Sequence, residues 1–143
     1  MDFLVTGGAG FIGSNLCREL AELGDVRVVD DLSTGNISNL DGVEVELHRF
    51  SILDLSRLVE ACEGVDCVFH EAALPNVSRS VRDPLGSNEV NVTGTLNVLE
   101  AARRSDVGKV VYASSSSVYG DTELLPKHED MKPSPLSPYA VSK

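Results

Sequence analysis

Eight residues, Thr6-Gly7-Gly8-Ala9-Gly10-Phe11-Ile12-Gly13, give the first indication of the architecture. They lie between an apolar run, residues 2–6, and residues 11–23, whose apolar side chains recur at helical spacing. Glycines between a strand and a helix let backbone N–H groups at the helix N-terminus approach a diphosphate. A turn that is merely flexible would use the same residues. Asp30 follows Gly10 by 20 residues, at the end of a second apolar run, and this combination predicts a dinucleotide site.

The rest of the chain continues the alternation of strand and helix. Strands are predicted over residues 2–6, 26–30, 43–47, 65–70 and 109–113. Helices are predicted over 11–23, after Asp54, over 87–104, and from Pro138 onward. Loops are expected over residues 31–41 and 120–137. This order predicts one α/β domain over 1–143, a Rossmann-type doubly wound parallel sheet of about five strands with helices on both faces.

Charge and cysteine content narrow the function classes. The 143 residues include 12 Lys and Arg against 22 Asp and Glu, and a formal charge of −10 has the wrong sign for nucleic acid. An acidic, lysine-poor surface also suits a protein that works at high salt. No apolar run is long enough for a membrane span. Cys17, Cys62 and Cys67 match no zinc spacing, so we expect no metal and buried thiols in the cytoplasm.

The acids at the end of the second strand indicate which dinucleotide binds. A carboxylate at Asp30 accepts hydrogen bonds from the ribose hydroxyls of the adenosine and repels a 2′-phosphate. Asp31 adds a second negative charge, and no Arg follows directly. The sequence therefore favours NAD over NADP.

Tyr139 and Lys143 are four residues apart at the start of the last predicted helix. This spacing places them on one face, where an ammonium group stabilises an ionised phenol and makes it usable as a general base. The alternative is an ordinary amphipathic helix with a half-buried tyrosine. His70 ends a strand, and we expect it to be structural.

Four motifs together resemble the extended short-chain dehydrogenase/reductases, and most closely their nucleotide-sugar epimerases. They are T-G-G-A-G-F-I-G at 6–13, D-D-L-S-T-G at 30–35, A-S-S-S-S-V-Y-G at 113–120, and Y-A-V-S-K at 139–143. They occur in the order that is typical of that family.

The resemblance implies an NAD-dependent epimerisation, with C4 of a UDP-hexose as the reacting centre. Hydride would pass from C4 to NAD and return to the other face of the 4-keto sugar. Tyr139 would remove the hydroxyl proton, Lys143 would lower the pKa of Tyr139 and hold the nicotinamide ribose, and Ser115 would hydrogen-bond the reacting oxygen. Ser117 stands where related dehydratases carry Glu, which favours epimerisation over dehydration.

The resemblance also implies the remaining binding residues. Arg79, Ser80, Ser115 and Ser116 are expected near the substrate, although Arg79 and Ser80 could equally cap a loop. Asn91 is expected near the active site, with a helix-surface amide as the alternative. The expected cofactor-binding residues are Gly7, Gly10, Phe11, Ile12, Gly13, Asp30, Asp31, Leu32, Ser33, Thr34, Gly35, Ser51, Ile52, Ala72, Ala73, Asn91, Ser114, Tyr139 and Lys143.

Length is the main departure from the family pattern. Members are about twice as long and carry a C-terminal domain that holds the nucleotide sugar, so we expect an incomplete NAD-binding domain without the substrate domain. Three alternatives stay open: an NAD-binding module without activity of its own, a nucleotide-sugar dehydratase, and an oxidoreductase. The family also implies a homodimer, through the helices at 87–104 and at Tyr139.

Overall fold

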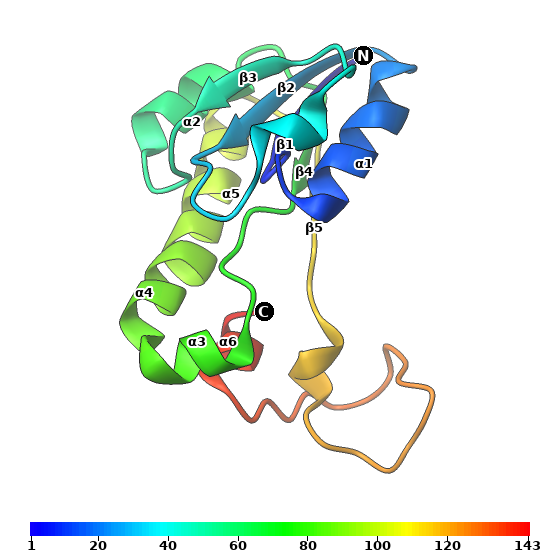
Figure 1. Cartoon of the computed structure of the whole chain (residues 1–143), viewed down its shortest axis with the longest axis vertical. Helices are drawn as coiled ribbons and strands as arrows, with labels where there is room; N and C mark the ends of the chain where they lie inside the picture. The colour runs from blue at the N-terminus through cyan, green and yellow to red at the C-terminus, as the bar shows by residue number, and fades with distance from the viewer.

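The computed structural model, which covers residues 1–143, has a five-stranded parallel sheet in the order β3-β2-β1-β4-β5 (Figure 1). The strands are β1 (Asp2–Thr6), β2 (Asp25–Asp30), β3 (Glu46–Arg49), β4 (Cys67–His70) and β5 (Lys109–Tyr112). Consecutive strands β1, β2 and β3 extend the sheet to one side, and β4 and β5 extend it to the other. This order confirms the predicted doubly wound sheet, with its topological switch point between β1 and β4.

Alternating side chains of the strands supply two separate cores. Leu4 of β1 and Val68 of β4 face a core with α2 (Leu55–Cys62) and α5 (Thr95–Arg104). Phe3 and Val5 of β1 face the opposite core, with Cys17 and Leu20 of α1 (Phe11–Ala21). Because side chains alternate along a strand, a parallel sheet that is apolar on both faces requires helices on both faces.

Helix boundaries follow local capping. The Asp54 carboxylate accepts a hydrogen bond from the backbone N–H of Arg57, as predicted for the start of α2. A short helix that was not predicted, α3 (Val77–Arg82), is capped by Asn76. Asp83 caps α4 (Pro84–Asn88), and both side chains accept from backbone N–H groups in the same way.

Three predicted elements require correction. The third strand occupies Glu46–Arg49 rather than 43–47, because Arg27 of β2 aligns with Glu46 while Val43 and Val45 pack against the core beside α1. The helix predicted over 87–104 begins at Pro84, and its middle turns, Glu89–Gly94, are π-helical. The fifth strand ends at Tyr112 rather than at residue 113, and residues 116–119 form a 3-10 turn.

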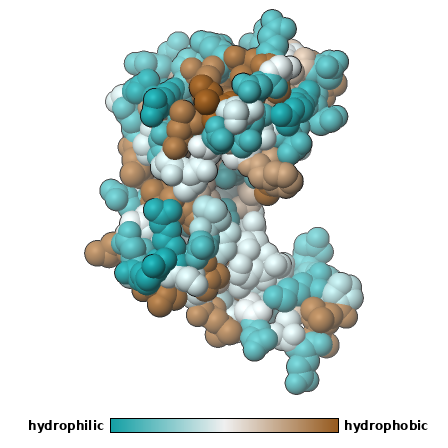
Figure 2. All heavy atoms as spheres, in the orientation of Figure 1, coloured by the Kyte–Doolittle hydropathy of each residue, from teal (hydrophilic) through white to brown (hydrophobic).

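The C-terminal part extends away from the sheet and ends in α6 (Pro138–Ser142), beside α3 and α4 (Figure 1). Polar and charged residues cover most of the face seen in Figure 2, with apolar residues in smaller groups between them. No helix combines the length and the apolar character needed to cross a membrane. All three cysteines are buried free thiols, as predicted, and burial raises the pKa of Cys17 and of Cys62 to about 11.

Candidate cofactor cleft

A cleft of about 360 Å³ opens at the carboxyl ends of all five strands. It is lined by the glycine turn after β1, by residues 29–31 and 33–35 around the end of β2, by residues 50–52 after β3, by residues 71–75 after β4, and by Ala113 and Ser114 after β5. In parallel α/β sheets, ligands bind outside the carboxyl ends of the strands at the switch point. The cleft occupies that position.

The glycine turn is tight because two positions leave no room for a side chain. Gly7 has φ +72°, and a Cβ there would lie 2.7 Å from the backbone nitrogen of Ala72. A Cβ on Gly13 would overlap the carbonyl oxygen of Gly7. The turn therefore brings the start of α1 close to β1 and to the loop after β4. The first amides of α1 have no carbonyl four residues earlier within the helix, so they can bind a diphosphate.

Asp30 is buried at the end of β2, with 8% of its surface exposed. Its carboxylate accepts hydrogen bonds from the backbone N–H of Ala9 (2.9 Å) and of Leu32 (2.8 Å). Asp30 thus joins the glycine turn to the loop after β2, and each oxygen keeps a further lone pair for a ligand in the cleft. Asp31 is exposed and accepts from the backbone N–H of Ser33 (2.8 Å).

His70 forms a buried chain of hydrogen bonds at the end of β4. Its Nδ1 lies 2.6 Å from the Thr6 hydroxyl and its Nε2 lies 2.8 Å from the Thr95 hydroxyl. Thr95 donates its single hydroxyl proton to the carbonyl of Asn91 (2.7 Å), so Nε2 is the donor to Thr95 and Nδ1 accepts from Thr6. Burial, with a smaller effect of Lys143, lowers the His70 pKa to about 4. His70 is therefore neutral and structural.

Asn91 is not the helix-surface amide that sequence left as an alternative; it is buried in the π-helical turns. Its side-chain oxygen accepts from the backbone N–H of Leu74 (2.8 Å), and its amide nitrogen donates to the Leu74 carbonyl (3.2 Å) and to the Ser142 hydroxyl (3.0 Å). Asn91 does not line the cleft. It holds the loop after β4 against α6.

Tyr139 and Lys143 both line the end of the cleft near β5. The Ser114 hydroxyl donates to the Lys143 carbonyl (3.0 Å), and the Lys143 Nζ lies 4.7 Å from the centre of the Tyr112 ring. Burial lowers the pKa of Lys143, and the negative charge of Glu71 opposes that effect. Tyr139 and Lys143 are thus both residues of the cleft lining.

The serines and the arginine expected at the substrate lie outside the cleft. The Ser115 hydroxyl is 2.5 Å from that of Ser117, and Ser116 is exposed in the 3-10 turn. Arg79 is exposed on α3. Ser80 is fully buried; its hydroxyl donates to the Val77 carbonyl and accepts from the backbone N–H of Tyr139 (3.0 Å), so it positions α6.

The cleft brings together most of the residues that sequence assigned to the cofactor. Leu32 is an exception, because it packs against the core beside α1. The predicted residues that line the cleft are Gly7, Gly10, Phe11, Ile12, Gly13, Asp30, Asp31, Ser33, Thr34, Gly35, Ser51, Ile52, Ala72, Ala73, Ser114, Tyr139 and Lys143.

Sequence reasoning missed several lining residues, namely Val29, Phe50, Glu71, Leu74, Pro75, Val90 and Ala113. Most directly flank a predicted residue, so extending each strand-end motif by one or two positions would have found them. Val90 has no such signal, because it comes from the long helix. The cleft contains three carboxylates, those of Asp30, Asp31 and Glu71, and one cation, Lys143. No group of three or more His, Cys, Asp or Glu side chains is arranged to hold a metal ion.

The sheet order, the glycine turn and the acid after β2 define a dinucleotide-binding α/β domain. Residues 3–143 match the model of the NAD dependent epimerase/dehydratase family, and the chain belongs to that family.

Named relatives fall on both the epimerase and the dehydratase side of the family. The chain is 45% identical to the UDP-glucose 4-epimerase of Mycolicibacterium smegmatis, over all of this chain and 48% of that protein. It superimposes on the Thermus thermophilus UDP-glucose 4-epimerase in complex with NAD with a TM-score of 0.92, 40% identity, and coverage of 100% of this chain and 47% of that one.

It also superimposes on DesIV, a dTDP-glucose 4,6-dehydratase from Streptomyces venezuelae solved with NAD bound, with a TM-score of 0.95 and 37% identity. That match covers all of this chain and 48% of the dehydratase. The chain spans about half the length of these relatives.

Proposed function

We propose that this chain binds NAD in the cleft and contributes the catalytic groups of a nucleotide-sugar epimerase that acts at C4 of a UDP-hexose. The observation that carries the proposal is that one cleft collects the glycine turn, Asp30, Tyr139 and Lys143. Crystal structures of UDP-glucose 4-epimerases with NAD bound have the same fold, which supports the assignment of the cofactor.

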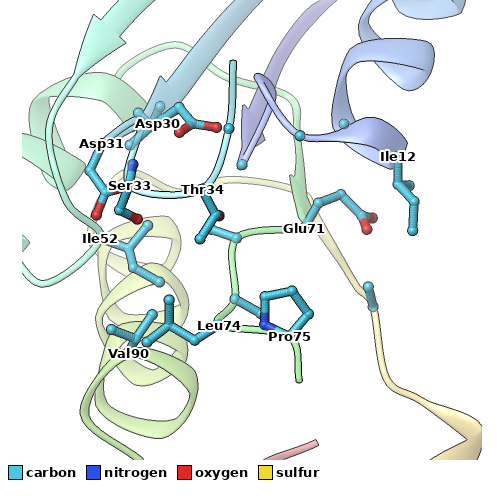
Figure 3. A pocket seen from close by; sticks show the side chains of 18 of the residues that line it. Ile12, Asp30, Asp31, Ser33, Thr34, Ile52, Glu71, Leu74, Pro75 and Val90 are labelled. Atoms are coloured by element: carbon cyan, nitrogen blue, oxygen red, sulfur yellow. The ribbon is translucent and has the colours of Figure 1, made fainter. Parts of the chain in front are cut away.

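The shape of the cleft fits an extended dinucleotide. The amides at the start of α1 suit the diphosphate, and the Gly13 position leaves no side chain between them and the turn. Asp30 and the exposed Asp31 suit the adenosine ribose, while Ile52, Leu74 and Val90 give an apolar wall (Figure 3). By elimination, the nicotinamide is assigned to the opposite end, beside Tyr139 and Lys143.

At that end the residues suit proton transfer from a sugar hydroxyl. NAD supplies the hydride acceptor when it is bound. Tyr139 takes the hydroxyl proton from C4 and returns it after the sugar has turned over. Lys143 lines the same cleft, and its ammonium supplies a positive charge in the cavity in which Tyr139 acts as the base. A role for Ser115 at the reacting oxygen stays a prediction, because this residue follows the lining residue Ser114 but lies outside the cleft, with its hydroxyl 2.5 Å from that of Ser117.

Ser117 supports epimerisation over dehydration, because a hydroxyl cannot supply the acid that expels a water molecule as readily as a carboxyl group does. A second candidate is an NAD-binding module without turnover of its own. The chain spans about half the length of each relative, so turnover by this chain is itself part of the proposal and is tested directly. Incubation of the chain with NAD and either UDP-glucose or UDP-N-acetylglucosamine, followed by NMR detection of C4 epimers, decides between the two.

Cofactor selection tests the proposal directly. We expect NAD to bind more tightly than NADP in calorimetric titrations. Asp30→Asn should weaken NAD binding about tenfold, equivalent to about 1.4 kcal/mol, and reduce the preference over NADP. Asp25→Asn is the matched control, because Asp25 is exposed at the other end of β2 and should leave both affinities unchanged. Equal affinity of the unaltered chain for NAD and NADP would contradict the assignment of Asp30.

A further inference from the structure

Glu71 is a carboxylate in the cleft to which neither the sequence motifs nor the proposed reaction gives a role. It follows β4 directly, and its backbone N–H donates to the Thr6 carbonyl (3.1 Å), which fixes it to β1. Its carboxylate forms no hydrogen bond or ion pair within the chain. Figure 3 shows this side chain on the opposite side of the cleft from Asp31 and Ser33, directed toward Ile12 at the start of α1.

The electrostatic surroundings of Glu71 differ from those of the two aspartates. The carboxylates of Asp30 and Asp31 accept hydrogen bonds from backbone N–H groups of the glycine turn and of the loop after β2. Glu71 instead lies near the segment that holds Lys143, the one cation that lines the cleft: Glu71 follows His70, which pairs with Tyr112 of β5, and the Ser114 hydroxyl just after β5 binds the Lys143 carbonyl. Burial raises the pKa of Glu71 and the charge of Lys143 lowers it, while Glu71 in turn raises the pKa of Lys143. The two groups form no ion pair, but each charge influences the other, and both line the cleft at the end assigned to the nicotinamide.

We propose that Glu71 sets the relative affinity of the cleft for the oxidised and reduced forms of the dinucleotide, by favouring NAD⁺ over NADH. This inference rests on the proposed function, since it requires the nicotinamide to bind at the Lys143 end. The two forms share their adenosine, diphosphate and ribose groups, and they differ in the positive charge of the oxidised nicotinamide ring. A nearby carboxylate attracts that charge and a nearby ammonium repels it.

The opposing charges of Glu71 and Lys143 suit a reaction in which hydride passes from the sugar to the cofactor and returns to the sugar within one cycle. Lys143 alone would favour the reduced cofactor by repulsion of the oxidised ring, and would thereby oppose return of the hydride. Glu71 offsets that bias without a direct ion pair, so Lys143 keeps its charge near Tyr139. Glu71 thus acts through its charge alone. It does not exchange the proton, which is the role of Tyr139.

The test compares NAD⁺ and NADH binding to the chain and to Glu71→Gln, which retains size and removes the charge. Calorimetry gives the dissociation constant of NAD⁺, and the fluorescence of NADH gives the dissociation constant of NADH. We expect the preference for NAD⁺ over NADH to fall about three- to tenfold, the size of a partly screened charge acting over several ångströms. Asp31→Asn is the matched control: it removes one charge from the same cleft at the adenosine end, so it should change both affinities by a common factor.

An equal change of both affinities in Glu71→Gln, or no change in either, would overturn the role of Glu71 and leave the NAD assignment standing. Failure of the unaltered chain to bind both forms would overturn the two proposals together. A second measurement varies the salt concentration. The difference in NAD⁺-to-NADH preference between the unaltered chain and Glu71→Gln should become smaller as salt is raised, because salt screens the charge that the substitution removes, and a difference independent of salt would also overturn the proposal.

Discussion

The buried histidine makes a quantitative prediction about stability. In the folded chain His70 is 1% exposed, it holds Thr6 and Thr95 through its two ring nitrogens, and its pKa is about 4. In the unfolded chain a histidine takes up a proton near pH 6.5. As the pH falls below 6.5, the unfolded chain binds this proton first, so the free energy of unfolding decreases until the folded chain also binds it near pH 4.

The size of the loss follows from the difference of about 2.5 between the two pKa values, 6.5 and about 4. At about 1.36 kcal/mol for each pH unit, His70 should remove about 3 kcal/mol of stability between pH 6.5 and pH 4. His70→Asn cannot take up this proton, and loss of the ring contacts should cost it about 2–4 kcal/mol at pH 7. The difference in free energy of unfolding between the unaltered chain and His70→Asn should therefore nearly vanish at pH 4.

Urea unfolding followed by circular dichroism at pH 7, 6, 5 and 4 measures this gap, and the other titrating groups largely cancel because both proteins contain them. A gap that stays constant over this range would refute the reasoning. NMR of the unaltered chain, with labelled histidine, gives an independent check. The His70 ring should stay neutral down to about pH 4, and titration near 6.5 would equally refute it.

Two further predictions concern the residues that shape the cleft. Gly13→Ala should destabilise the chain by about 3 kcal/mol and abolish NAD binding, because the added methyl group overlaps the Gly7 carbonyl. The control Glu19→Ala, on the exposed face of α1, should change the free energy of unfolding in urea by less than about 0.5 kcal/mol. Asn91→Ala should cost about 2–4 kcal/mol, because the Leu74 N–H and carbonyl lose their partner, whereas Asn88→Ala on the exposed side of the same helix should be nearly neutral. Unfolding midpoints that match the controls would contradict either argument.

The sheet could be predicted because its strands are apolar on both faces and are separated by residues with clear turn or capping chemistry. The β1 turn and the Asp54 cap are examples, since each depends on contacts within a few residues. The third strand was misplaced because its position depends on pairing with β2, which is set by the register of Arg27 with Glu46. Hydrophobic alternation at Val43 and Val45 indicates a buried segment and does not distinguish a strand from a packed loop.

The cleft could be predicted where its residues follow strand ends directly, because parallel strands bring their carboxyl ends to one edge of the sheet. Ser80 and Asn91 could not be resolved in this way. Their roles depend on hydrogen bonds to Tyr139 and Leu74, which lie 59 and 17 residues away along the chain. The role proposed for Glu71 likewise depends on the charge of Lys143, which is 72 residues later (143 − 71), and no local sequence pattern indicates that the two residues line one cleft.

The placement of α6 links these distant contacts to the proposed chemistry. A helix of five residues is too short to be stable alone, so tertiary contacts must fix its position. Ser80 binds the backbone of Tyr139, Asn91 binds Ser142, and Ser114 binds the Lys143 carbonyl. These three polar side chains come from α3, the long helix and the end of β5. The positions of Tyr139 and Lys143 are therefore determined largely by side chains that bind Ser142 or the backbone of Tyr139 and Lys143. None of these three bonds involves the Tyr139 phenol or the Lys143 ammonium.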